Sequence, residues 1–198
     1  MRFKVMPAVS VLTLMTTLGA GTASADSTSD RNRGALARLA DGTWSEADLA
    51  LIRSQPAIAA QVMDPSRPPE VTTGSAPAQG PTTLAASCKS YWVNYSYYSA
   101  LGSKIYTWQK YVTACYNGSA VTSISERYDW LPSYQSMIKV RERTVDSQSG
   151  TGTWQYNSRI ARHLEYCVAK YGCYADTYPW AQFKIYGNGT WWYQGADS

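Results

Sequence analysis

The residues best suited to acid–base chemistry are few. His163 is the only histidine among 198 residues, and Glu165 follows two positions later. Side chains alternate between the two faces of a strand, so the two lie on one face if this segment is extended. A His–Glu pair can transfer protons, but nucleophilic catalysis also needs an activated Ser or Cys, and the sequence has no G-x-S-x-G motif. We therefore expect no catalytic residue and favour a protein that is not an enzyme.

Metal and cofactor binding have equally little support. One histidine and four cysteines are present, and an even number of cysteines suits disulfides rather than a zinc-ligand set. No acidic loop has the spacing of a calcium site. Carboxylates that could pair for glycosidic cleavage lie beside basic residues such as Arg127, Arg141 and Arg143, which is typical of surface charges. We expect no metal and no cofactor.

The N-terminus predicts export. The chain starts with Arg2 and Lys4, and an apolar stretch covers residues 9–18. A small-residue cleavage motif ends at Ala25, so residues 1–25 are typical of a secretory signal peptide. No other apolar run approaches the roughly 18 residues that a membrane span needs. We expect a secreted, extracellular protein without membrane insertion, whose cysteines form disulfides.

The richest aromatic stretch predicts a β-hairpin. Two runs of Tyr and Trp, residues 89–98 and 104–116, flank a short loop, and aromatic residues favour strands. If the loop is centred on Leu101-Gly102, Cys88 faces Cys115 across the hairpin. The same register gives three aromatic pairs, which are Trp92 with Tyr111, Tyr95 with Trp108, and Tyr97 with Tyr106.

This register predicts a Cys88–Cys115 disulfide. It leaves Cys167 and Cys173 to pair across the five-residue loop between them. A bulge in the hairpin would spoil the match, and Cys115 would then bond elsewhere. The second choice is Cys115–Cys167, which would join distant strands and stabilise more, because closing a longer loop restricts the unfolded chain more.

Composition divides the chain after the signal peptide into three parts. Residues 26–64 predict a short helical lead or pro-segment, with a capping box in which Thr43 is the N-cap and Glu46 reaches back. Residues 65–87, rich in Pro, Thr, Ser and Ala, predict an extended linker with little to bury. Residues 88–198 predict a disulfide-bridged β domain, since all sixteen tyrosines lie there.

The β domain contains alternating segments at short spacing. We expect about seven antiparallel strands, and therefore a mainly β fold, either a sandwich or a small barrel. Residues 129–133 and 172–179 are expected to be loops or irregular. A final hairpin turns at Asn188-Gly189 and pairs Tyr186 with Trp191.

Several local motifs carry a resemblance. They are Trp108, Cys115-Tyr116-Asn117-Gly118, Cys167, Gly172-Cys173, Tyr178-Pro179-Trp180 and Tyr186-Gly187-Asn188-Gly189-Thr190. Together they resemble small secreted, β-rich, cysteine-containing proteins of actinobacteria over about residues 88–193. That group is functionally uncharacterised, so the resemblance implies a compartment and a β fold but no activity.

Two kinds of side chain could bind a partner. Exposed Tyr and Trp suit stacking on sugar rings or anchoring a protein interface, and Trp191 and Trp192 must point to opposite faces of their strand. Lys139, Arg141 and Arg143 share one side of a strand and could bind an anionic polymer, although such a stripe can also be a solvated face that discourages edge pairing. The candidate ligand-binding residues are Tyr95, Trp108, Trp191, Trp192, Lys139, Arg141 and Arg143.

The sequence thus favours a secreted, non-catalytic β module that binds a cell-wall polymer, a glycan or a secreted protein through aromatic residues. The alternative is a secreted inhibitor of an exported hydrolase, presenting the cystine-stiffened loop 168–172. The third is an enzyme or zymogen with residues 26–87 as a removable lead. Nucleic acid is a poor candidate, because the net charge of +4 comes without a dense Lys/Arg cluster.

Overall fold

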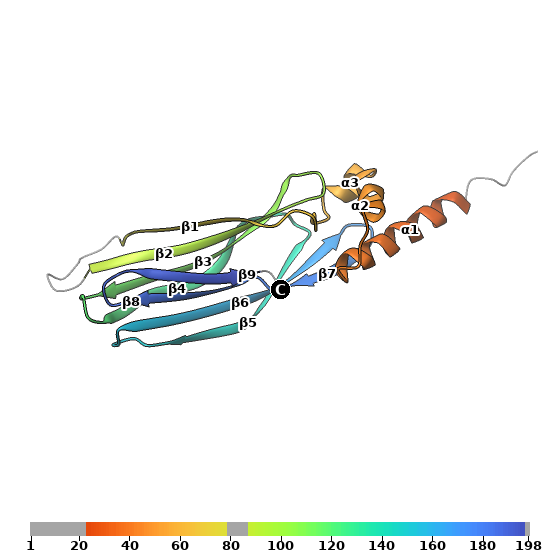
Figure 1. The fold of residues 1–198 in the computed structure, drawn as a ribbon. Helices are drawn as coiled ribbons and strands as arrows, with labels where there is room; N and C mark the ends of the chain where they lie inside the picture. The colour runs from red at the N-terminus through yellow and green to blue at the C-terminus, as the bar shows by residue number, and fades with distance from the viewer. Residues whose placement is uncertain (1–22, 79–86, 197–198) are drawn as a thin grey trace, which may run out of the picture.

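A computed structural model describes residues 23–78 and 87–196. In this part of the chain three helices precede nine strands (Figure 1). The helices are α1 (Ala23–Ala40), α2 (Glu46–Arg53) and α3 (Pro56–Ala59). The strands are β1 (Glu70–Pro77), β2 (Ser87–Tyr98), β3 (Lys104–Tyr116), β4 (Val121–Tyr134), β5 (Ile138–Ser149), β6 (Gln155–Val168), β7 (Gly172–Thr177), β8 (Trp180–Tyr186) and β9 (Trp191–Ala196).

The strands form two antiparallel sheets that pack face to face (Figure 1). One has four strands in the order β1-β2-β3-β4, and the other has β5-β6-β8-β9 with β7 also paired to β6. The expected mainly β, antiparallel fold is confirmed as a sandwich of two sheets. The described residues contain more strands than expected, because β1 and β7 come from segments predicted to be a linker and irregular.

The central hairpin has the predicted register. Cys88 faces Cys115, Trp92 faces Tyr111 and Tyr95 faces Trp108. Its one irregularity lies between Tyr97 and Tyr98, next to the loop, so it does not disturb the pairs below. Both predicted disulfides are present, Cys88–Cys115 with an S–S distance of 2.01 Å and Cys167–Cys173 with 2.07 Å.

The predicted linker contains a strand. Residues 70–77 form β1, which pairs with β2 so that Thr72 faces Asn94 and Gly74 faces Trp92. The Val-Thr-Thr run that opens this strand favours extended backbone, and Pro77 is tolerated because it ends an edge strand. The segment predicted to be an extended linker with little to bury is extended and largely exposed here, but it is paired as an edge strand of the sheet, which was not expected; residues 79–86 lie outside the described part.

Two expectations about loops are wrong. Residues 129–133 continue β4 instead of forming a loop, with Pro132 accommodated on the edge of the sheet beside a register shift. The last hairpin is shifted by one residue, so Ile185 rather than Tyr186 faces Trp191. The shift arises because the connection uses three residues, with Gly189 at a φ of 78°.

The core lies between the two sheets and is rich in tyrosine. Tyr91, Tyr106 and Trp108 from the first sheet pack with Tyr156, Tyr166, Phe183 and other residues of the second. The hydroxyls of Tyr106 and Tyr166 are 2.7 Å apart and join the sheets by a hydrogen bond. Alternation along β2 and β3 sends these aromatic side chains inward and leaves the intervening residues on the outside.

The helical lead packs against one end of the sandwich (Figure 1). Leu36, Leu49 and Ile52 form a second core with Ala100 from the β2–β3 loop and Val168 at the end of β6. The capping box of α2 starts two residues later than predicted, with Ser45 as the N-cap and Asp48 reaching back. Residues 1–22 lie outside the described part, so the signal peptide stays a prediction.

Candidate functional site

The outward side of the four-stranded sheet carries a regular array of polar and aromatic side chains. Alternation places every second residue of each strand outward, and the antiparallel register aligns these residues in rows across β1 to β4. We call two neighbouring rows the polar–aromatic face. It consists of Thr72, Gly74, Trp92, Asn94, Gln109, Tyr111, Tyr128 and Trp130.

The first row is aromatic and runs from Gly74 through Trp92 and Tyr111 to Tyr128. The rings of Tyr111 and Tyr128 are stacked, with centroids 5.0 Å apart and planes 17° apart. The indole of Trp92 lies over Gly74, where an added Cβ would come within 2.3 Å of Trp92 Cζ2. Three rings therefore form a strip on the sheet, and the glycine makes room for the first of them.

The second row consists of hydrogen-bonded amides and an indole. Trp130 Nε1 donates to Gln109 Oε1, Gln109 Nε2 donates to Asn94 Oδ1 at 2.7 Å, and Asn94 Nδ2 donates to Thr72 Oγ1 at 3.1 Å. The chain of bonds fixes the orientation of both amides. Each amide uses one of its two N–H groups in the row, which leaves the other N–H for a ligand.

Further hydroxyl pairs extend this face on both sides. Ser90 and Thr113 are joined at 3.0 Å, and Thr113 donates to Glu126 at 2.8 Å. Ser96 and Thr107 form the equivalent pair beyond the amide row, also at 3.0 Å. A shallow polar cleft adjoins Glu126 and is lined by Ser123, Ser125, Arg127, Gln148 and other residues. Ser90, Thr113 and Ser96 are buried, so these pairs link neighbouring strands, and a ligand along the strands would meet mainly Glu126 and Thr107 beyond the two rows.

The structure places the four predicted aromatic binding residues differently. Tyr95 and Trp108 are buried in the core, with 3% and 0% of their surface exposed, so the hairpin face opposite the cystine is the dry one. Trp191 packs partly buried against the core. Trp192 is 44% exposed. Only Trp192 of the four therefore lies mainly at the surface.

Sequence reasoning overlooked the residues that form the polar–aromatic face. The predicted hairpin register places Tyr111 opposite Trp92, so two members of the aromatic row could have been recognised from the sequence. Trp130, which is 50% exposed, was hidden because its segment was expected to be a loop. Tyr128 could not be aligned with Tyr111 until the β3–β4 register was known.

The predicted basic stripe is not a continuous cationic surface. Lys139 and Arg141 are exposed, but Arg141 donates two 2.8 Å hydrogen bonds to the carboxylate of Glu165. Register shifts on either side of Arg143 turn that residue toward Asp129, at 2.6 Å. Both arginine charges are thus neutralised by carboxylates.

His163 belongs to a charged cluster on the outside of the second sheet. Its Nε2 is 2.7 Å from Asp176 Oδ1, and its ring stacks on Tyr178 at 5.0 Å. The hydrogen bond to Asp176 and the nearby Glu142 carboxylate raise the pKa of His163 above its ordinary value. The sequence placed Glu165 beside His163 but not Asp176, because β7 was not expected.

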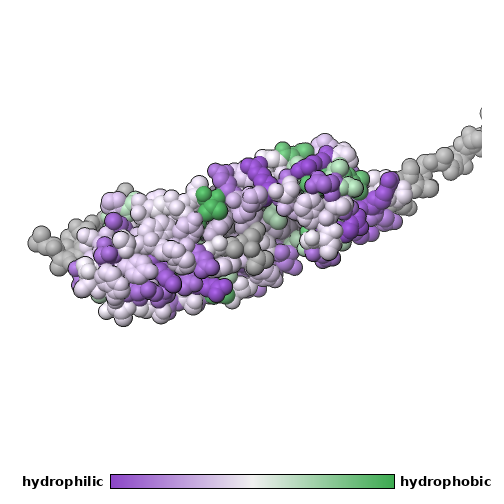
Figure 2. Space-filling model, in the orientation of Figure 1, coloured by the Kyte–Doolittle hydropathy of each residue, from purple (hydrophilic) through white to green (hydrophobic). Residues whose placement is uncertain are grey.

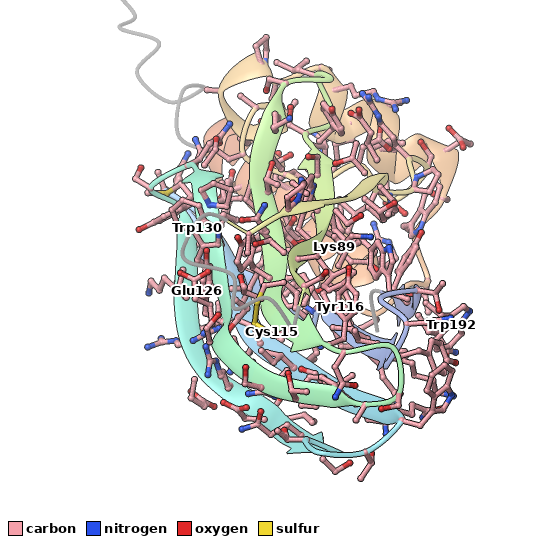
Figure 3. The ribbon with its side chains drawn as sticks, turned by 90° about the vertical axis from the view of Figure 1, so that its left-hand side faces the viewer. Lys89, Cys115, Tyr116, Glu126, Trp130 and Trp192 are labelled. Atoms are coloured by element: carbon pink, nitrogen blue, oxygen red, sulfur yellow. A yellow bond between two sulfur atoms is a disulfide. The ribbon has the colours of Figure 1, made fainter. Side chains whose placement is uncertain are left out.

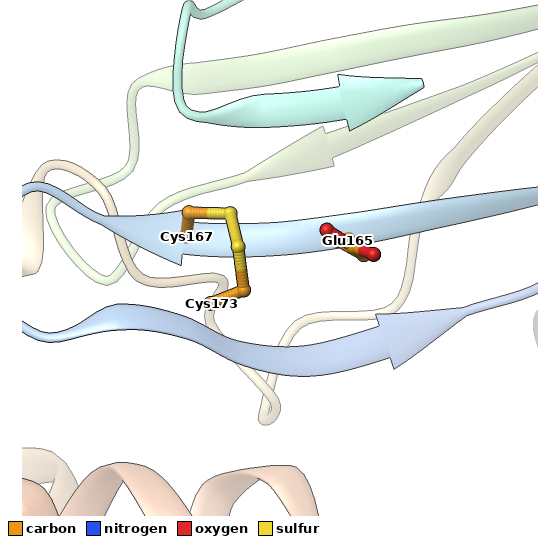
Figure 4. Close-up of side chains that lie close together, drawn as sticks. All are labelled: Glu165, Cys167 and Cys173. Atoms are coloured by element: carbon orange, nitrogen blue, oxygen red, sulfur yellow. A yellow bond between two sulfur atoms is a disulfide. The ribbon is translucent and has the colours of Figure 1, made fainter. Parts of the chain in front are cut away.

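The surroundings of this cluster oppose metal binding. Ligand atoms of His163, Glu165 and Asp176 lie within 4.8 Å of one another, but the guanidinium of Arg141 on Glu165 opposes a second cation there. Glu165 also lies near Cys167 and Cys173 (Figure 4). Those two sulfurs are bonded to each other and so offer no thiolate. We assign no metal to either group.

Two buried ionisable groups inside the sandwich were not anticipated. Lys110 is fully buried, and its Nζ donates to the carbonyl oxygens of Ser158 at 2.5 Å and Ala181 at 3.0 Å. Burial lowers the pKa of Lys110 to about 6. Asp129 is buried as well, and although burial opposes its ionisation, hydrogen bonds from Arg162, Trp108 and Arg143 hold its pKa below the ordinary value. Neither group reaches the surface, so neither offers a catalytic site.

Fold and site together define a two-sheet antiparallel β sandwich with a polar–aromatic outer face and a docked helical lead. Comparison of the chain with protein-family models, curated proteins and solved structures gives no match. Among the helices of residues 23–78 and 87–196, none has the length and apolar character needed to cross a membrane.

Proposed function

We propose that this protein is a secreted, non-catalytic β module that binds a neutral glycan polymer through the polar–aromatic face. The observation that carries the proposal is the presence of two neighbouring rows, one aromatic and one of amides, on one side of the sheet. Stacked aromatic rings run beside amides whose orientation is fixed by hydrogen bonds.

The two rows match the two kinds of surface on a sugar. Aromatic rings such as Tyr111 and Tyr128 offer an apolar surface on which the C–H face of a sugar ring can stack. The free N–H and carbonyl capacity of Asn94 and Gln109 can bind hydroxyl groups. Because these side chains are already held in place, little conformational entropy is lost on binding.

The shape of the face favours a polymer over a small molecule. Small-molecule sites are concave and enclose most of the ligand, whereas this surface extends over four strands. The exposed carboxylate of Glu126 and the polar cleft beside it continue the surface beyond the two central rows. An extended chain can contact several rows at once, and each contact adds to the affinity. A cell-wall polysaccharide is a partner of this kind.

The compartment is consistent with such a ligand. Each sheet contains one disulfide between neighbouring strands, and disulfides persist mainly in oxidising, extracellular surroundings. The N-terminal 25 residues carry the features of a signal peptide. Secretion would bring the polar–aromatic face into contact with surface polymers.

The inhibitor hypothesis receives less support. The cystine-stiffened loop 168–172 would have to be accessible to a target enzyme. Instead Tyr171 accepts a 2.9 Å hydrogen bond from Asn32 of α1, and the backbone N–H of Ala169 donates to Gln61 Oε1 at 2.9 Å. The helical lead therefore holds this loop on one side.

A sedimentation assay with insoluble neutral polysaccharides tests the proposal. The protein from Asp26 onward is expected to bind at both low and high salt, since stacking is not screened as charges are. Tyr111→Ala combined with Tyr128→Ala should weaken binding roughly tenfold or more. The control is Trp192→Ala, which removes an exposed indole from the opposite sheet. Undiminished binding by the double variant, or wild-type binding only at low salt, would reject the polar–aromatic face as a glycan site.

A further inference from the structure

The outside of the second sheet carries a different surface. Six outward residues form two short rows across β6, β8 and β9. One row is Asn157, Lys184 and Trp192, and the other is Arg159, Gln182 and Gln194. We call these six residues the cationic face. Figure 3 shows Trp192, which belongs to it, on the opposite side of the molecule from Glu126 and Trp130 of the first sheet.

Both cations of this face lie over indole rings. The guanidinium carbon of Arg159 is 4.5 Å from the ring centroid of Trp180, and Lys184 Nζ is 5.0 Å from that of Trp192. A cation over an indole is held by the ring's negative face without losing its charge. The two side chains are thus kept in place on the sheet while their charge stays available to a ligand.

These two charges differ from the other arginine charges of the sandwich. Arg127, Arg141, Arg143 and Arg162 all form ion pairs with carboxylates. Within the described residues Arg159 and Lys184 form none, and none of the six residues of the cationic face is acidic. The charges of Arg141 and Arg143 on β5 are paired with carboxylates, so the charges of Arg159 on β6 and Lys184 on β8 are more available to a ligand than theirs.

The spacing of the charges suits a repeating anion. Lys184 faces Asn157, and Arg159 is two residues further along β6, so the two cations are diagonal neighbours on adjacent strands. Diagonal residue positions in a sheet are roughly 7–8 Å apart, and the two charged ends extend from them to different indoles, Trp180 and Trp192. Two separate cations on one face can bind negative charges on different units of one polymer, and a guanidinium binds a planar carboxylate by two parallel hydrogen bonds.

We infer that the cationic face binds an acidic polysaccharide, one whose sugars carry carboxylates. The amides of Asn157, Gln182 and Gln194 lie between and beside the two cations, and amides hydrogen-bond hydroxyl groups. Trp192 is 44% exposed and adds apolar surface at the edge. This combination matches a polymer that has both carboxylates and hydroxyls. The site is separate from the proposed neutral-glycan site, so one molecule could link two kinds of chain.

Binding to immobilised polygalacturonate tests this inference. The protein from Asp26 onward should bind this polymer. Its affinity for the methyl ester, in which the negative charge is masked, should be lower by roughly tenfold or more. Arg159→Gln combined with Lys184→Gln should cause a similar loss, and Arg159→Lys, which keeps the charge but not the two parallel hydrogen bonds, should lose less than the double variant. The matched control is Lys139→Gln with Lys170→Gln, which removes the same charge from exposed positions elsewhere and should change binding less than about twofold.

Three results would overturn the inference. They are equal binding to the methyl ester, an equal loss in the two charge-matched double variants, and equal binding to inorganic polyphosphate, which would indicate general anion binding. Circular dichroism of each variant verifies that the fold is intact. The double variant of Tyr111 and Tyr128 should bind polygalacturonate as the wild type does, so failure of the neutral-glycan proposal would leave this result unaffected.

Discussion

At the residue scale, each side chain's role follows from which face of its strand it occupies. Tyr95 and Tyr111 are both tyrosines of one hairpin, yet the first is 3% exposed in the core and the second lies in the outer aromatic row. The residue type alone does not distinguish them. Alternation along the strand does, once it is known which face is covered.

Lys110 shows the opposite case, a charged residue type on a covered face. It lies beside Trp108 and Val112 on the inward side of β3, and its Nζ bonds only carbonyl oxygens among the described contacts. An ammonium group in the core is costly. Burial therefore favours the neutral amine of Lys110 over the ammonium form, which is why its pKa is lowered to about 6.

Lys110 should make stability depend on pH. The unfolded lysine keeps its proton up to about pH 10.4, whereas the folded one releases it near pH 6. Unfolding between these values takes up a proton, so a rise in pH favours the folded state by up to about 1.4 kcal/mol per unit. We expect wild type to gain stability relative to Lys110→Met from pH 6 to about 9, measured by urea unfolding.

The comparison with Lys110→Met removes the contributions of other groups. The pKa of His163 is raised in the folded state, so protonated His163 stabilises the fold at pH values below the ordinary pKa of histidine. This stabilisation is lost as the pH rises through the raised pKa. Burial raises the pKa of Tyr174 to about 12, so tyrosines reverse the trend above about pH 10. Both act equally in the two proteins. A stability difference that stays constant with pH would contradict the account of Lys110.

At the element scale, the central hairpin was predictable and its neighbours were less so. Cys88, Cys115 and the aromatic pairs between them define the β2–β3 register within one local stretch. The strand over residues 70–77 has prolines nearby and little apolar pattern, so its identity depends on pairing with β2. β7 likewise becomes a strand by pairing with β6. Such edge strands are determined by tertiary contacts, which the local sequence does not contain.

The same limit applies to the candidate site. The hairpin register placed Trp92 opposite Tyr111, but the row is complete only with Gly74 and Tyr128 from the two outer strands. The sequence therefore predicted that aromatic residues of the hairpin bind a ligand, but two of the candidates, Tyr95 and Trp108, lie on the face that is buried in the core. The choice required knowing where the second sheet packs.

Gly74 tests how the aromatic row is built. A side chain there would collide with the indole of Trp92, since even a Cβ would lie 2.3 Å from it. We expect Gly74→Val to displace Trp92, change the near-ultraviolet circular dichroism and destabilise the fold by about 1–3 kcal/mol. Ala76→Val, on the same face of the same strand, is the control. Equal effects of the two substitutions would show that Trp92 does not depend on Gly74.

At the scale of the whole molecule, the lead and the sandwich form one body. The space-filling view in Figure 2 shows the most hydrophobic surface residues gathered largely over the helical end, whereas the β region is mostly pale or purple. The helices bury Leu49 and Ile52 together with Ala100 and Val168 of the sandwich. Asp64 further accepts a 2.9 Å hydrogen bond from Arg53, and Arg53 also donates to the Ala100 carbonyl at 3.3 Å.

This packing predicts that the lead stabilises the sandwich. Leu49→Ala should cost about 2–5 kcal/mol, and the loss should lower the unfolding midpoint reported by tyrosine near-ultraviolet signals, because all tyrosines lie at or after Tyr91. Leu51→Ala, at a half-buried position of the same helix, should cost less. If the tyrosine midpoint stays unchanged while the helical signal is lost, the lead is an independent unit.

The outer faces of the two sheets differ in chemistry. The first sheet presents stacked rings and amides, and the second presents two cations over indoles. They lie on opposite sides of one rigid core (Figure 3). The proposed neutral-glycan site and the inferred acidic-polysaccharide site can therefore be occupied together without steric conflict.

The most direct measurement for the central proposal is an NMR titration of the isotope-labelled protein with a soluble neutral oligosaccharide. The account predicts shift changes that concentrate in β1 to β4, at the indole N–H of Trp130 and the amide groups of Asn94 and Gln109, with Trp192 unaffected. Changes centred on β6, β8 and β9, or no changes at millimolar oligosaccharide, would contradict it.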